Sequence, residues 1–244
     1  MVNRLMVGKV VFAIFLLCAV IVIASPAQTF KTLVSFSGAD GANPAYSLLQ
    51  GSGGNFYGTT EYGGASGAGT VIEITPKGKL TTLYSFCSQS NCTDGALPLA
   101  ALIQATNGNF YGTTFEGGAA GAGTIFEITP KGKLSRLYSF CSQKNCDDGS
   151  YPEAGLVQAK NGNWYGTTAS GGVNGNYGTI FDINAKGKLT TPHSFCSEKG
   201  CPDGAIAFGA LVRGTNGILY GTTFTGGTDG FGTVFSLSTV LGTP

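Results

Sequence analysis

The segment GTVIEITPKGKLTTLYSFCSQSNCTDGALPLAALIQATNGNFYGTTFEGGAAGA, residues 69–122, is the unit from which the chain is built. It returns from Gly123 as GTIFEITPKGKLSRLYSF and from Gly178 as GTIFDINAKGKLTTPHSF. The YGTT tyrosines stand at positions 57, 111, 165 and 220, so successive copies are 54, 54 and 55 residues apart. A fixed period of this length indicates a repeat architecture. We expect a partial copy at about 30–68, full copies at 69–122, 123–177 and 178–231, and a last strand at 232–240.

Each unit contains four segments typical of short β-strands. Residues 69–75 are rich in β-branched side chains and end at a Pro-Lys-Gly turn signal, and residues 80–86 alternate between two faces. Residues 101–105 and 109–114 flank Asn107-Gly108, a pair suited to a tight hairpin turn. No segment of the repeats has a sustained helical period of apolar residues. The sequence therefore predicts an all-β protein.

Four strands in about 54 residues are typical of a blade of a β-propeller. A parallel β-helix is the alternative, but its coils are shorter and would not need a hairpin in each unit. The first copy lacks its first strand, and the segment 232–237 is a first strand with nothing after it. We therefore expect sixteen strands in four blades, with the last strand completing the first blade. The competing interpretation is a piece of a longer array.

The first 27 residues have the pattern of a secretory signal peptide. Arg4 and Lys9 precede an apolar run of residues 10–23, and small residues come before Gln28. This run is shorter than the roughly 20 residues that span a bilayer, which disfavours an uncleaved anchor. Cys18 suggests a lipoprotein, but a lipoprotein processing site needs a small residue before the cysteine, and large side chains precede Cys18. We expect an extracellular or cell-surface domain of residues 28–244, with no stable membrane span.

Net charge excludes one class of partner. The chain carries 14 basic and 13 acidic residues, for a formal charge of +1. It has no basic stripe of the kind that attracts nucleic acid. We therefore expect no nucleic-acid partner.

The cysteines of the repeats fall in closely spaced pairs within one loop of each full unit. The first copy has a loop four residues shorter and lacks both cysteines, so the pairs are lost together. This favours disulfides over zinc ligation, because no histidine accompanies the pairs and export is expected. The predicted bridges are Cys87–Cys92, Cys141–Cys146 and Cys196–Cys201.

An Asp-Gly pair follows this loop in every copy and is the first candidate ligand site. In a ring, four carboxylates would lie at equivalent points of one rim, where they could bind calcium or a hydroxylated ligand. The alternative is a turn in which the aspartate bonds its own backbone. The candidate residues are Asp40, Asp94, Asp148 and Asp203.

The YGTT tyrosines are the second candidate. Exposed tyrosines beside Phe110 or Trp164 could form a platform on which sugars stack. An aromatic residue repeated in every unit is more often core packing between blades, and Trp164 is expected in the core. The candidate residues are Tyr57, Tyr111, Tyr165 and Tyr220.

A catalytic cluster is harder to build from this sequence. His193 is the only histidine and replaces the tyrosine at positions 84 and 138, so it stands in a structural position. Glycosidases need only two carboxylates. Glu61 and Glu116 are the least regular acids of the repeats, although nothing in the sequence pairs them.

The joint motif of NGNFYGTT, Gly-Gly, GTIFEI, KGKL and YSF at this period resembles the GloVer tandem-repeat family of exported bacterial proteins. The resemblance covers about residues 30–240. It implies a secreted or cell-surface repeat protein and brings no catalytic residues with it. Because every polar candidate is repeated and no asymmetric catalytic cluster stands out, we expect a non-catalytic binding module for extracellular polysaccharide or protein, with either no cofactor or calcium. The alternatives are a carbohydrate-active hydrolase or lyase that uses rim carboxylates, and a purely structural spacer.

Overall fold

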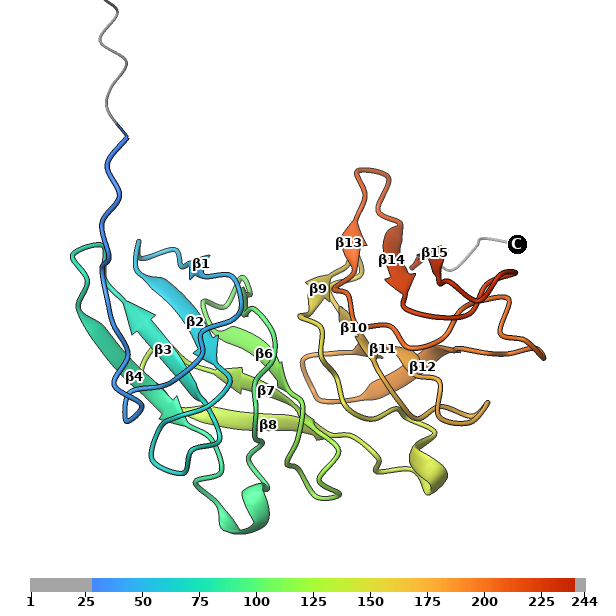
Figure 1. Ribbon diagram of the computed structural model, residues 1–244, viewed down its shortest axis with the longest axis horizontal. Helices are drawn as coiled ribbons and strands as arrows, with labels where there is room; N and C mark the ends of the chain where they lie inside the picture. The colour runs from blue at the N-terminus through green and yellow to red at the C-terminus, as the bar shows by residue number, and fades with distance from the viewer. Residues whose placement is uncertain (1–27, 240–244) are drawn as a thin grey trace, which may run out of the picture. The chain divides into compact units, whose positions relative to one another are not determined.

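The computed structural model of the protein describes residues 28–239 (Figure 1). The expected signal peptide, residues 1–27, lies outside them. The chain divides into two structural units. The described part of the first, residues 28–33, contains neither helix nor strand, and the second, from Val34 onward, contains all the described strands. No helix within residues 28–239 has the length and apolar character needed to cross a membrane.

The second unit is built from antiparallel sheets in which neighbours in sequence are neighbours in the sheet (Figure 1). Blade 1 contains β1 (Leu49–Gln50), β2 (Phe56–Thr60), β3 (Thr70–Ile74) and β4 (Leu80–Ser85). Blade 2 contains β5 (Ile103–Gln104), β6 (Phe110–Thr114), β7 (Thr124–Ile128) and β8 (Leu134–Ser139). Blade 3 contains β9 (Val157–Gln158), β10 (Trp164–Thr168), β11 (Thr179–Ile183) and β12 (Leu189–Ser194). Blade 4 contains β13 (Val212–Arg213), β14 (Leu219–Thr223) and β15 (Thr233–Leu237).

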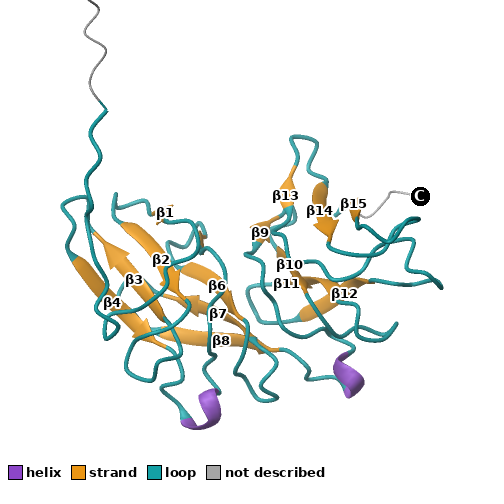
Figure 2. Cartoon of the chain, in the orientation of Figure 1, coloured by secondary structure: helices purple, strands orange, loops and turns teal. Residues whose placement is uncertain are grey.

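The predicted all-β propeller of four blades is thus the fold of this protein. Within residues 28–239, helix is confined to two 3-10 turns, η1 (Ser90–Cys92) and η2 (Lys144–Cys146), which Figure 2 shows in purple. Both turns lie inside disulfide loops. The three predicted disulfides are present, and they join Cys87 to Cys92, Cys141 to Cys146 and Cys196 to Cys201.

The blade boundaries differ from those expected. A sheet combines the last two strands of one sequence unit with the first two of the next, and β15 pairs with β14 rather than with blade 1. The physical reason is the short glycine-rich connection between β14 and β15, which brings Thr223 opposite Thr233 just as the same connection brings Thr60 opposite Thr70. Residues 31–36, expected to form a strand, form none.

The core lies between consecutive blades. Three clusters of buried apolar side chains each combine residues of two neighbouring blades. Phenylalanines that follow the outer strands are completely buried in them and meet an aromatic ring of the next blade edge to face, with Phe86 5.1 Å from Phe126 and Phe140 5.1 Å from Phe181. Both faces of a central strand therefore need apolar residues, which explains the TVIEI and TIFEI patterns.

Candidate functional site

The aspartates of the Asp-Gly pairs hold together the loops in which they lie. The buried Asp94 carboxylate accepts hydrogen bonds from the Tyr84 hydroxyl at 2.7 Å and from the N–H and hydroxyl of Ser88, each at 2.9 Å. Asp148 is bound in the same way, with the Tyr138 hydroxyl at 2.8 Å. Burial acts to raise the pKa of Asp94, but the hydrogen bonds from Tyr84 and Ser88 outweigh it, and the pKa is lowered from its ordinary value.

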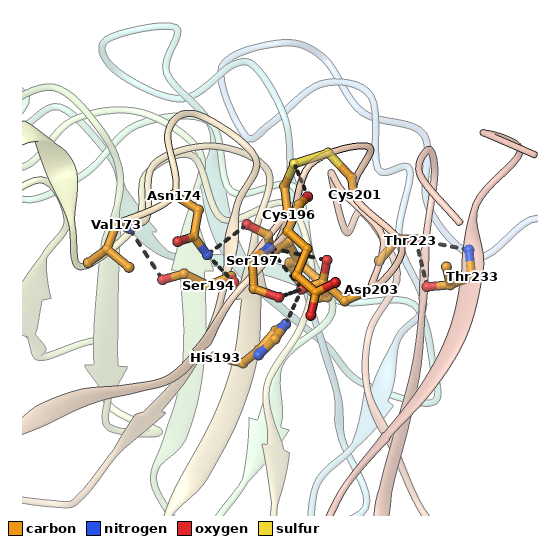
Figure 3. A network of polar contacts seen from close by, with 12 residues as sticks. Val173, Asn174, His193, Ser194, Cys196, Ser197, Cys201, Asp203, Thr223 and Thr233 are labelled. Atoms are coloured by element: carbon orange, nitrogen blue, oxygen red, sulfur yellow. Dashed lines mark hydrogen bonds and ion pairs between the residues drawn. A yellow bond between two sulfur atoms is a disulfide. The ribbon is translucent and has the colours of Figure 1, made fainter. Parts of the chain in front are cut away.

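A histidine takes the place of the tyrosine in the third such loop (Figure 3). The Nε2 atom of His193 lies 3.0 Å from Oδ2 of Asp203, and the Ser197 hydroxyl donates to the same oxygen at 3.0 Å. Burial acts to raise the pKa of Asp203. Hydrogen bonds from Ser197 and the charge of His193 outweigh this effect, so the pKa is lowered from its ordinary value. His193 therefore occupies a structural position, as its place in the repeat predicted.

Asp40 lies in the shorter loop that has no cysteines. It accepts a hydrogen bond from the Ser37 N–H at 2.8 Å, and this bond is the main reason that its pKa is lowered. The four aspartates thus stand in four separate loops. Within residues 28–239 no three His, Cys, Asp or Glu side chains are grouped so that they could hold a metal ion.

Three of the four YGTT tyrosines are buried between blades, and two of these bind a glutamate. The hydroxyl of Tyr57 donates to Glu73 at 2.8 Å, and that of Tyr111 donates to Glu127 at 2.7 Å. Burial, followed by the hydrogen bond to the glutamate, raises the pKa of each tyrosine to about 12. Tyr220, in blade 4, is 38% exposed.

Tyr165 is also buried, but its surroundings break the pattern. Asp182 stands where blades 1 and 2 have a glutamate, and its side chain is shorter by one methylene group. Burial is the main cause that raises the pKa of Tyr165, and the charge of Asp182 and a hydrogen bond to its side chain add to the effect. The Tyr165 oxygen also accepts a hydrogen bond from the Asn161 amide at 2.9 Å. The Oδ1 atom of Asp182 is buried without a hydrogen-bond partner in the described part of the chain.

Asn161, Tyr165 and Asp182 line a pocket of about 680 Å³. Its wall combines Tyr165 and Asp182 of blade 3 with the Asn161 amide, the hydroxyl-bearing Thr190 and Thr191, and the end of β15 at Leu237. The pocket wall therefore combines a carboxylate residue with hydroxyl and amide groups, a combination suited to binding a hydroxylated ligand.

Sequence reasoning singled out Tyr165 but missed Asp182. The available signal was GTIFDI in the third copy where the two earlier copies end in Glu-Ile. Asp182 keeps the negative charge of the glutamates in the earlier copies, but its side chain is shorter by one methylene group. Trp164 is buried, as expected, but its Nε1 atom also has no hydrogen-bond partner among the described residues.

Glu61 and Glu116 both lie near the exposed Tyr62. The pKa of Tyr62 is raised, first by its hydrogen bond to Glu61 and to a smaller extent by the charge of Glu116. The structure thus brings these two acids toward the same surface tyrosine, which the sequence did not predict.

Several solved structures are similar to this chain in fold. The PQQ-bound aldose sugar dehydrogenase of Streptomyces coelicolor is 16% identical with a TM-score of 0.47, over 81% of this chain and 60% of that one. A candidate 6-phosphogluconolactonase of Bacteroides uniformis is 17% identical with a TM-score of 0.47, over 84% and 56%. A luciferin-regenerating enzyme is 12% identical with a TM-score of 0.45, over 72% and 52%. The chain therefore spans between about half and three fifths of the length of these structures.

No curated protein matches the sequence. A family model does match it, over residues 19–146 and 84–243, and the two matches together include all four blades. The match includes the YGTT strands, the glycine-rich connections and the disulfide loops described above. The chain belongs to the Gloeobacter/Verrucomicrobia repeat family.

Proposed function

We propose that the protein is an exported, non-catalytic binding module, and that the pocket beside Tyr165 binds extracellular polysaccharide. The observation that carries the proposal is the Oδ1 atom of Asp182, which is buried at the pocket without a hydrogen-bond donor. A buried carboxylate oxygen without a partner is costly. A ligand hydroxyl that reaches this oxygen would supply the missing donor.

The three disulfides support export, because such bonds persist in oxidising compartments. The signal-peptide pattern of residues 1–27 agrees with this location. Binding without catalysis is supported by the pocket lining, in which Asp182 is the single carboxylate among the described residues. Glycoside hydrolysis uses a pair of carboxylates across the scissile bond.

Binding is tested by thermal unfolding of the purified chain against a panel of soluble polysaccharides. A ligand at about 100 times its dissociation constant adds roughly 2.7 kcal/mol of stability, which shifts the melting temperature by about 2–4 °C in a domain of this size. Asp182→Asn should abolish the shift. The matched control is Glu127→Gln, which changes the same position of blade 2, where the carboxylate already has partners.

Two results would contradict the proposal. One is the absence of a shift with every polysaccharide, which would leave a structural spacer or a protein ligand as the better account. The other is an equal loss of binding in Asp182→Asn and Glu127→Gln, which would place the ligand elsewhere.

A hydrolase is the second candidate function, favoured by the approach of Glu61 and Glu116 to Tyr62. Chromatography of each polysaccharide after incubation with the chain would reveal shortened products. Products that disappear in both Glu61→Gln and Glu116→Gln would establish hydrolysis, whereas unchanged polysaccharide supports binding alone.

A further inference from the structure

Consecutive blades are joined by the same apolar contact at each junction. Every core cluster contains a β-branched residue from the third strand of one blade and a leucine that precedes the first strand of the next. None of these side chains is more than 5% exposed. The three pairs are Val71 with Leu102, Ile125 with Leu156, and Ile180 with Leu211.

The same junctions share two hydrogen bonds to the backbone. At the first junction the N–H of Leu97 donates to the carbonyl of Ala68 at 2.8 Å, and the hydroxyl of Thr59 donates to the carbonyl of Ala100 at 2.9 Å. The donor Leu97 has a left-handed φ of 55°. Both bonds recur at the other junctions, from Tyr151 to Ala122, Ile206 to Tyr177, Thr113 to Ala154 and Thr167 to Gly209.

Blade 4 carries the first half of such a junction without its partner. Val234, the counterpart of Val71, is 80% exposed, and Phe231, the counterpart of Ala68, is 92% exposed. The Phe231 carbonyl accepts no backbone hydrogen bond from the described residues, and Thr222, the counterpart of Thr59, is exposed. We call the surface formed by Thr222, Phe231 and Val234 the trailing face.

Blade 1 carries the complementary half. Leu48, the counterpart of Leu102, is 50% exposed. Asn43 has the left-handed φ of 55° that Leu97 has, but its N–H donates no backbone hydrogen bond among the described residues. Tyr46, whose carbonyl corresponds to that of Ala100, is 36% exposed. We call the surface formed by Asn43, Tyr46 and Leu48 the leading face.

The missing outer strand of blade 4 has a counterpart in the sequence that precedes the leading face. In blades 1 to 3 the third strand pairs with an outer strand, whereas β15 pairs with β14 alone among the described strands. Residues 30–36 align with residues 80–86, which include β4, and are identical at Thr32, Leu33, Ser35 and Phe36. Phe30 is 96% exposed. An open strand edge of this kind is a template for an added strand.

We propose that the trailing face of one copy binds the leading face of a second copy, head to tail, in the register that joins consecutive blades within the chain. Residues 30–36 of the second copy add to β15 as the fourth strand of blade 4. Leu48 of the second copy packs on Val234, and its Asn43 N–H donates to the Phe231 carbonyl. A second copy is the occupant because both faces are exposed in one and the same chain, so that neither fills the other. Contacts between unlike faces build rings or filaments.

Sedimentation velocity of the purified chain over a range of concentrations measures the association. The mass should rise above that of one chain as the concentration increases. Leu48→Asp and Val234→Asp should each weaken association at least about tenfold, because each places an unpaired charge in the contact. Val173→Asp is the control, since Val173 is 67% exposed but belongs to neither face. All three substituted side chains are exposed, and circular dichroism should show folded variants.

Mixing the two weakened variants gives the decisive result. Leu48→Asp keeps an intact trailing face and Val234→Asp keeps an intact leading face, so the mixture should form a dimer containing one of each. A chain that remains monomeric at all concentrations would overturn the proposal, and so would an assembly that survives both substitutions. Failure of the mixture to form dimers would exclude the head-to-tail register.

Discussion

The Nε2 atom of His193 lies 3.0 Å from the Oδ2 atom of Asp203, where the tyrosine hydroxyls of two earlier blades bind their aspartates. Because tyrosine already makes this contact twice, we expect His193→Tyr to unfold at nearly the wild-type urea concentration at pH 7. His193→Ala removes one partner of the carboxylate and should cost about 1 kcal/mol. If the alanine variant unfolds at the same midpoint as the wild type, the contact contributes nothing to stability.

Asp94 should make folding stability depend on pH in the acid range. Its pKa is lowered in the folded chain, so its contribution is present above the ordinary pKa of 3.8 and is lost as the pH falls through the folded value. Asp94→Asn should therefore cost about 1–3 kcal/mol at pH 7, and the difference from wild type should shrink below a pH of about 4. Urea unfolding across this range measures it. Asp229→Asn, on an exposed side chain, is the control and should unfold at nearly the wild-type urea concentration at pH 7.

The glycine of the YGTT strand is required by packing. A Cβ atom at Gly112 would lie 2.7 Å from the Phe126 ring and 2.9 Å from Leu102, closer than side chains pack. We expect Gly112→Ala to lower the free energy of unfolding by about 1–3 kcal/mol, as overpacked cores do. Gly53→Ala is the matched control, because a Cβ atom there meets nothing within 4 Å. Equal stability of the two variants would mean that the strand can shift to make room.

Each disulfide should contribute modestly, because it joins cysteines only five residues apart. A loop this short restricts the unfolded chain little, and loop-closure entropy gives roughly 2 kcal/mol. The double variant Cys141→Ala with Cys146→Ala should lose about that amount in chemical unfolding. A reducing agent should lower the free energy of unfolding of this variant by about one third less than that of the wild type, because two of the three disulfides remain. A loss several times larger would show that the bridge also positions Asp148.

Short-range patterns predicted much of the fold. The hairpin turn Asn107-Gly108, the β-branched run at 69–75 and the paired cysteines all act within a few residues, so the sequence reveals them directly. The division of strands among sheets was harder, since β15 has the same sequence pattern whether it ends one blade or completes another. Its short connection to β14 decided the pairing.

The candidate site was predictable only in part. Tyr165 could be found because it repeats, but the role of Asp182 depends on a distance across the strand pair β10 and β11 that no repeat pattern contains. The sequence shows that Asp94, Asp148 and Asp203 recur in the repeat. Only the structure shows which hydrogen-bond donors surround each carboxylate.

The sequence by itself determined the repeat, the all-β class, the four blades, the disulfide pairs and the family, because turn chemistry and alternation are local and the repetition multiplies the signal. Tertiary structure alone decided which surfaces are left over. Val71 and Val234 occupy equivalent positions in the repeat, yet one is completely buried and the other is 80% exposed. The reason is that burial depends on a neighbouring blade, and no blade among the described residues covers this side of blade 4.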